Sequence, residues 1–93
     1  MGKAVLVNGK DNVITAVSDL DIGEDVVYRT SSEIKSIKTA ETIPYGHKIA
    51  LTKISKGSYI IKYGEVIGRA RNDIKPGEWV HTHNTEETYV PSR

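Results

Sequence analysis

The chain has 93 residues, a formal net charge of +1 and no cysteine, so it is long enough for one domain and too short for a second. Its 13 Lys and Arg residues and 12 Asp and Glu residues alternate along the sequence, which excludes the one-sided charge of a protein that binds nucleic acid or an anionic membrane. The lack of cysteine excludes a disulfide framework, and the lack of a signal peptide or a long apolar run leads us to expect a cytoplasmic protein.

The N-terminal part predicts short strands separated by tight turns. An apolar strand over residues 4–7 stops at the Asn8-Gly9 turn signal, and a second strand over residues 12–17 follows it. The two strands could pair as a hairpin. The polar stretch 29–42 is compatible with one helical turn near its start and, equally, with two strands joined by a turn.

Short β-branched runs and Gly turns alternate through the rest of the chain. Because the runs are short and their connections are tight, they leave little room for helix. Further strands are expected over residues 26–28, 47–52, 59–62, 66–70 and 79–83. The sequence therefore predicts a compact all-β domain over residues 1–85, with at most short 3-10 or single-turn helices, followed by a polar C-terminal tail over residues 86–93.

One turn sequence recurs, and we call it the turn cassette: an aliphatic residue, two variable residues, Gly, two more residues and a β-branched residue. The aliphatic residue is expected to anchor the loop in the core, and Gly supplies the positive φ that closes the turn. Copies are centred on Gly23, Gly57 and Gly77, and further turns are expected at Gly46 and Gly64. Gly68 lies inside a predicted strand, where Gly indicates a β-bulge or a close backbone contact.

The last predicted strand carries two candidate metal ligands. Alternation along a strand from Trp79 to His83 would place His81 and His83 on one face. Two imidazoles so placed can hold one metal ion, with a third ligand from His47, Glu78 or a partner chain. The alternative is that these are polar residues at a strand end.

Two further pairs of residues are candidates for acid–base chemistry or anion binding. His47 and Lys48 follow a Gly turn directly. Histidine suits proton transfer near neutral pH, and lysine can hold a carboxylate; the alternative is a turn-capping His beside a solvated Lys. Arg69 and Arg71 share one face of a predicted strand, as either a solvated pair or an anion-binding pair.

Several motifs in fixed order resemble the SAF domain of the altronate and galactarate dehydratase family. These are GHKIAL, IKYGEVIGRA and HTHN, together with DNVITAVSDLDIGEDV near the start. The resemblance implies a β-clip fold, as in type III antifreeze proteins. It also implies a small subunit, or an N-terminal domain, of a metal-dependent lyase. Such a lyase dehydrates a sugar acid to a 2-keto-3-deoxy acid together with a large catalytic subunit or domain.

The resemblance also implies roles for the candidate residues. His47, Lys48, His81 and His83 would take part in catalysis at the boundary with the partner, with His81 and His83 as metal ligands. The divalent ion, Fe, Mn or Mg, would lie mainly in the partner chain. The substrate-binding residues would be Arg69, Arg71 and Asn84. The alternatives are a non-catalytic sugar-acid-binding or assembly module and the small subunit of a sulfolactate sulfo-lyase. The sequence leaves open a homo-oligomer, the substrate and the metal.

Overall fold

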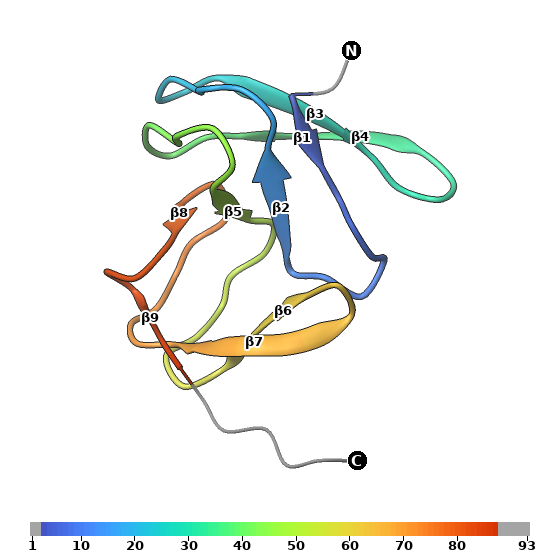
Figure 1. Cartoon of the computed structure of the whole chain (residues 1–93). Helices are drawn as coiled ribbons and strands as arrows, with labels where there is room; N and C mark the ends of the chain where they lie inside the picture. Colours follow the sequence, from blue (N-terminus) through green and yellow to red (C-terminus); the bar gives the residue numbers. More distant parts are fainter. Residues whose placement is uncertain (1–2, 88–93) are drawn as a thin grey trace.

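The computed structural model describes residues 3–87, and within that range it contains β-strands and no helix (Figure 1). The predicted all-β class is therefore confirmed, and the compact arrangement of small sheets is consistent with a β-clip. The strands are β1 (Ala4–Val5), β2 (Val13–Ala16), β3 (Asp25–Arg29), β4 (Ile34–Lys38), β5 (Lys48–Ala50), β6 (Tyr59–Lys62), β7 (Glu65–Ala70), β8 (Trp79–Val80) and β9 (Thr85–Glu86). None of the described residues forms a helix that could cross a membrane.

Three antiparallel sheets make up the fold. The central sheet has the order β1-β2-β5-β8, a hairpin pairs β3 with β4, and a third sheet has the order β6-β7-β9. In Figure 1 the β3–β4 hairpin lies at one end of the molecule and the β6-β7-β9 sheet at the other, with the central sheet between them. The central sheet therefore connects the two ends.

The central sheet is buried on both faces because it separates two apolar clusters. Alternation along β2 directs Ile14 into one cluster and Val13 into the other, as expected for successive residues of a strand. In the same way β5 contributes Ile49 to the first cluster and Ala50 to the second. Both strands thus hold the two halves of the molecule together.

The polar stretch 29–42 supplies a turn and strand β4, which pairs with the preceding β3, so neither a helical turn nor a strand pair of its own forms there. Strands β3 and β4 pair over their full length. The backbone N–H of Thr30 donates to the carbonyl of Glu33 at 2.8 Å, and the Thr30 hydroxyl accepts the N–H of Glu33 at 3.0 Å. These local hydrogen bonds close the turn between β3 and β4.

The turn cassette occurs four times rather than three, because the segment from Ile43 to Ile49 adopts the same form. Gly23, Gly46, Gly57 and Gly77 have φ values of 76°, 82°, 87° and 87°. At most 2% of each flanking aliphatic or β-branched residue is exposed. These residues are Leu20, Ile43, Ile54 and Ile74 before the Gly, and Val26, Ile49, Ile60 and Val80 after it. The anchor role expected of the cassette is therefore observed in every copy.

The four cassettes associate in pairs. Isolated antiparallel bridges join Leu20 to Ile43 and Ile54 to Ile74. Each pair also has a carboxylate bond of the same kind: the N–H of Tyr45 donates to Asp19, and the N–H of Lys56 donates to Asp73, both at 2.8 Å. The pairing gives the molecule two similar halves, one on each side of the central sheet.

Two glycines are required by close backbone approach. A Cβ atom at Gly77 would collide with the carbonyl oxygen of Lys38. At Gly68 a Cβ atom would lie 3.1 Å from the carbonyl oxygen of Glu86, and the register between β6 and β7 shifts beside it, between Ile60 and Ile61. Gly68 thus occupies the irregular, closely packed position that its place inside a strand indicated.

The C-terminal strands differ from the prediction. The strand expected over residues 79–83 ends at Val80, and residues 81–84 form a turn. Strand β9 then pairs with β7 through Ala70 and Thr85 and through Arg69 and Glu86. The sheet therefore continues into the segment that was predicted as a tail, because β7 offers it a free edge. Residues 88–93 of that tail lie outside the described residues.

Candidate functional site

Three histidines and the single tryptophan form a cluster, which we call the His–Trp cluster. His47 comes directly before β5, and Trp79 begins β8, which pairs with β5. The indole Nε1–H of Trp79 donates to Nδ1 of His47 at 3.1 Å. The ring of His81 is stacked on that of Trp79, with centroids 5.4 Å apart, and the centroid of His83 lies 5.1 Å from that of Trp79. His47 and His81 are also in contact, with centroids 4.5 Å apart.

Asn84 determines the shape of the loop that carries His81 and His83. Its Oδ1 accepts the N–H of His81 at 2.9 Å, and its Nδ2 donates to the carbonyl of Trp79 at 2.8 Å. The hydroxyl of Thr85 adds a bond to the carbonyl of His81 at 2.8 Å. A turn, rather than strand alternation, therefore brings both imidazoles to Trp79. Asn84 was predicted to bind substrate, but it is buried and both ends of its amide are used within this loop.

The environment of His81 favours its neutral form. Partial burial lowers the pKa of His81, and the electrostatic effects of His47, Lys48 and His83 lower it further. A neutral imidazole can accept a proton or donate a hydrogen bond near neutral pH. Lys48 follows His47 directly in the chain and pairs with Val80 of β8.

The described residues do not build a metal site by themselves. Residues 3–87 contain no group of three or more His, Asp or Glu side chains that could hold a metal ion. Nδ1 of His47 is taken by the indole N–H, and a carboxylate oxygen of Glu78 accepts the N–H of Lys75 at 2.7 Å. The strand face on which His81 and His83 were expected to lie side by side is replaced by a turn. Metal ligation by these two residues stays a prediction that requires ligands from elsewhere.

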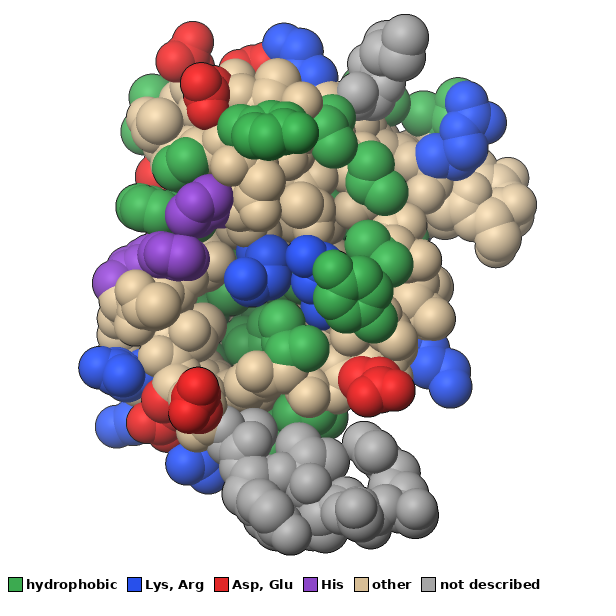
Figure 2. Space-filling view, viewed as in Figure 1, with side chains coloured by type: hydrophobic (Ala, Val, Ile, Leu, Met, Phe, Trp, Pro, Cys, Tyr) green, Lys and Arg blue, Asp and Glu red, His purple; other side chains and the backbone are tan. Residues whose placement is uncertain are grey.

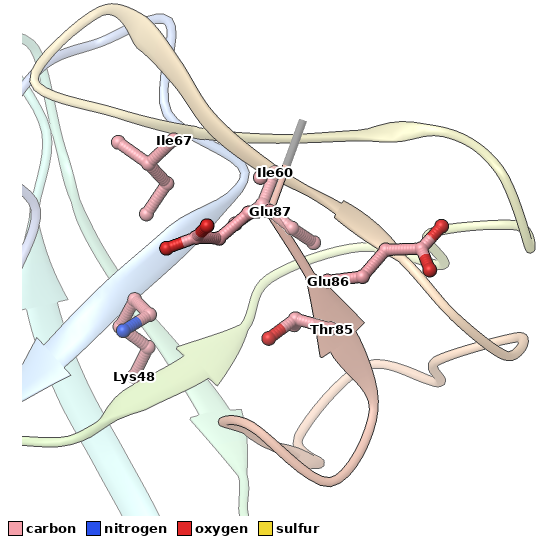
Figure 3. A pocket seen from close by; sticks show the side chains of 7 residues that line it. Lys48, Ile60, Ile67, Thr85, Glu86 and Glu87 are labelled. Atoms are coloured by element: carbon pink, nitrogen blue, oxygen red, sulfur yellow. The ribbon is translucent and has the colours of Figure 1, made fainter. Parts of the chain in front are cut away.

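A small hollow of about 110 Å³ lies around Lys48, and we call it the Lys48 hollow. Figure 3 shows that Lys48, Ile67 and Glu87 line it from different segments, whereas the carboxylate of Glu86 points away from Lys48. Burial lowers the pKa of Lys48, and the charge of Lys62 lowers it further. A bound anion would offset both effects on Lys48, but the carboxylate of Glu87 lines the same hollow and would oppose such an anion. Its full lining is Lys48, Ile60, Ile67, Gly68, Thr85, Glu86 and Glu87.

The two candidate arginines make contacts with β9. Arg69 holds Glu86 through Nε at 3.1 Å and through a terminal nitrogen at 3.0 Å, and Arg71 donates to the carbonyl of Thr85 at 3.3 Å. Neither arginine lines the Lys48 hollow. The structure thus brings His47, His81 and His83 together around Trp79. Lys48 lines the neighbouring hollow, and the arginines make contacts that fix β9 to β7.

The space-filling view shows how these features are distributed on the surface. In Figure 2 the His side chains gather at one edge of the face, and Lys or Arg side chains lie beside a hollowed region with hydrophobic side chains at its floor. Sequence reasoning did not foresee Trp79 as a hydrogen-bond partner of His47. Nor did it foresee Glu41, whose carboxylate accepts the N–H of Trp79 at 2.9 Å. These pairs are 32 and 38 residues apart in the chain, so no local pattern could have revealed them.

Comparison with known proteins gives a consistent result. Residues 2–88 match the family model described as the altronate/galactarate dehydratase SAF domain. Altronate dehydratase of Bacillus subtilis (strain 168) is 40% identical over 87 residues, which cover 92% of this chain and 16% of that protein. (2R)-sulfolactate sulfo-lyase subunit alpha of Paracoccus pantotrophus is 42% identical over 59 residues, which cover 63% of this chain and 87% of that subunit. Galactarate dehydratase (L-threo-forming) of Escherichia coli (strain K12) is 37% identical over 76 residues, or 82% of this chain and 14% of that protein. The chain thus spans only a small part of the two dehydratases and most of the sulfo-lyase subunit.

Proposed function

The chain belongs to the altronate/galactarate dehydratase SAF domain family, and from this membership we propose that it is the SAF component of a sugar-acid hydro-lyase. The proposed reaction eliminates water from an aldonic or aldaric acid to give a 2-keto-3-deoxy acid. The observation that carries the proposal is the contact between the imidazole rings of His47 and His81, whose centroids lie 4.5 Å apart, within a chain whose relatives include altronate and galactarate dehydratases.

The chemistry of such an elimination matches the groups at this site. A base must remove the proton on the carbon next to the carboxylate, and positive charge must stabilise the enediolate that forms. In our proposal His81 is the base, because the neutral ring has a free lone pair. Lys48 binds the substrate carboxylate at the Lys48 hollow. A divalent Fe, Mn or Mg ion, held mainly by the partner, would supply further charge stabilisation.

A larger catalytic region is part of the proposal. The Lys48 hollow, at about 110 Å³, is well below the roughly 300 to 1,000 Å³ typical of small-molecule sites. The matched segment makes up only 16% of the Bacillus subtilis altronate dehydratase. We therefore place most of the substrate site in a large dehydratase subunit or domain, with the His–Trp cluster at the boundary. We expect the assembled enzyme to be cytoplasmic.

The second candidate function is that of the small subunit of a sulfolactate sulfo-lyase. It is favoured by one observation: the matched segment covers 87% of the Paracoccus pantotrophus subunit, so a separate chain of this kind exists. The two reactions would differ in the leaving group, which is hydroxide in one and sulfite in the other. Both would use a base beside a bound carboxylate.

Co-expression with a dehydratase-like large chain tests both candidates. The purified assembly would be assayed against altronate, galactarate, other sugar acids and sulfolactate. Formation of a 2-keto-3-deoxy acid supports the hydro-lyase, and release of sulfite supports the sulfo-lyase. If the assembly forms and Lys48→Ala and His81→Ala both leave its turnover unchanged, the chain is an assembly module without a catalytic part.

A further inference from the structure

The bond between Trp79 and His47 determines which nitrogen of His47 carries a proton. An indole N–H can only donate, and a neutral imidazole has one N–H and one acceptor nitrogen. Because Nδ1 of His47 accepts the Trp79 N–H at 3.1 Å, the ring hydrogen must lie on Nε2. His47 in this arrangement is a neutral ring that presents an Nε2–H group.

The Nε2 end of this ring is open to a ligand. No hydrogen bond to Nε2 is found among residues 3–87, and Thr15 Oγ1 is the one buried side-chain nitrogen or oxygen there that lacks a partner. Nε2 of the half-buried His47 is therefore accessible rather than buried and unpaired. The ring of His81 is a direct neighbour of His47, with centroids 4.5 Å apart.

We propose that Trp79 is a positioning residue that holds His47 as a neutral hydrogen-bond donor, and that Nε2–H binds an acceptor oxygen of the ligand. This inference rests on the proposed function, in which the ligand is a sugar acid whose carboxylate and hydroxyl oxygens are acceptors. A general base and a metal ligand both need a lone pair on the free nitrogen. While the indole bond is formed, His47 has no such lone pair on Nε2.

The backbone of Trp79 is fixed in a way that suits this role. Its N–H donates to Glu41 at 2.9 Å and its carbonyl accepts from Asn84 at 2.8 Å. The stacked ring of His81, inclined by 9° to the indole, packs against one side of the ring. The backbone bonds and the stacked His81 ring thus restrict the orientation of the indole.

Nitrogen NMR of the 93-residue chain tests the tautomer directly. At about pH 9, where histidine is neutral, we expect a through-bond 15N–15N coupling between Trp79 Nε1 and His47 Nδ1, with the ring shifts of the Nε2–H tautomer. Trp79→Phe keeps an aromatic ring but removes the donor. It should move the tautomer ratio about fivefold toward Nδ1–H, the factor that corresponds to about 1 kcal/mol for one hydrogen bond.

His83→Asn is the matched control, because His83 contacts the Trp79 ring without a hydrogen bond to His47. This variant should keep the coupling and the tautomer ratio. Absence of the coupling in the wild-type chain overturns the proposal, and so does an unchanged ratio in Trp79→Phe. These measurements need no enzyme activity.

The turnover of the assembled enzyme tests whether the Nε2–H tautomer of His47 contributes to catalysis. Trp79→Phe should lower kcat about tenfold, less than the hundredfold or more typical of complete loss of a positioned donor. Wild-type turnover by an assembled Trp79→Phe enzyme whose tautomer ratio has moved would overturn the positioning role. If the wild-type assembly acts on no sugar acid, the proposed function fails while the tautomer measurement still stands.

Discussion

The side-chain amide of Asn84 joins two ends of one loop, donating to the carbonyl of Trp79 at 2.8 Å while it accepts the N–H of His81 at 2.9 Å. Because Asn84 is only 6% exposed, water cannot readily replace it. The residue therefore holds His81 against Trp79, and its influence on the site is through the loop rather than through a ligand.

We expect Asn84→Ala to lower the free energy of unfolding by about 1 to 3 kcal/mol, the effect of leaving buried polar groups without partners. Asn72→Ala is the control, because Asn72 is exposed. Urea denaturation measures both variants. Equal stability of the two would show that the amide bonds do not hold the loop.

The cassette anchors should dominate the stability of the domain. Ile54→Ala or Ile74→Ala removes a side chain that is 2% or 1% exposed, and such core truncations reduce stability by about 2 to 5 kcal/mol. Ile22→Ala, at a position that is 68% exposed, should have little effect. Thermal or denaturant unfolding measures the change in the free energy of unfolding. A decrease below about half a kcal/mol for both core variants would refute the anchor role.

A comparison of Gly57→Ala with Gly77→Ala separates the cost of a left-handed backbone conformation from the cost of a steric collision. Both have φ of 87°, so Ala at either position adopts a left-handed conformation that costs roughly 1 to 2 kcal/mol. A Cβ atom meets nothing within 4 Å at Gly57 but collides with the carbonyl of Lys38 at Gly77. We therefore expect Gly77→Ala to be clearly the less stable variant by denaturant unfolding. Similar losses would mean that the packing of Gly77 against β4 is not tight.

His81 should make the domain less stable in acid. The pKa of His81 is lowered in the folded state, so the unfolded chain binds more protons around and below the ordinary histidine pKa of about 6.5. Stability should rise with pH through that window and be lost as the pH falls through it. In His81→Asn the difference in unfolding free energy between pH 8 and pH 5 should be smaller than in the wild type. An unchanged difference would remove His81 as its source.

Turnover of the assembled enzyme should depend on the His–Trp cluster. We expect His47→Ala and His81→Ala each to lower kcat by roughly a hundredfold or more, the scale for loss of a positioned donor or a proton-transfer group. Circular dichroism should show that the fold is unchanged, since both side chains are only partly buried. Wild-type turnover across pH 6 to 9 in folded, assembled variants would favour an assembly module instead.

The sequence by itself determined the fold class and most of its turns. Short β-branched runs separated by Gly turns leave little room for long helices. The spacing of an aliphatic residue three positions before a Gly and a β-branched residue three positions after it identified Gly23, Gly57 and Gly77 from local chemistry. The fourth cassette, around Gly46, has the same residue pattern and was overlooked as a cassette.

Only the tertiary structure decided how the candidate site is assembled. Alternation predicted His81 and His83 on one strand face, but the strand ends at Val80 because the Asn84 amide turns the chain back. The bond from Trp79 to His47 joins residues 32 positions apart, and it forms because β5 and β8 are neighbours in the central sheet. Local patterns fix turns, since a turn needs only adjacent residues. The contacts that set a tautomer or shift a pKa depend on which distant strands pair, and that is a property of the whole fold.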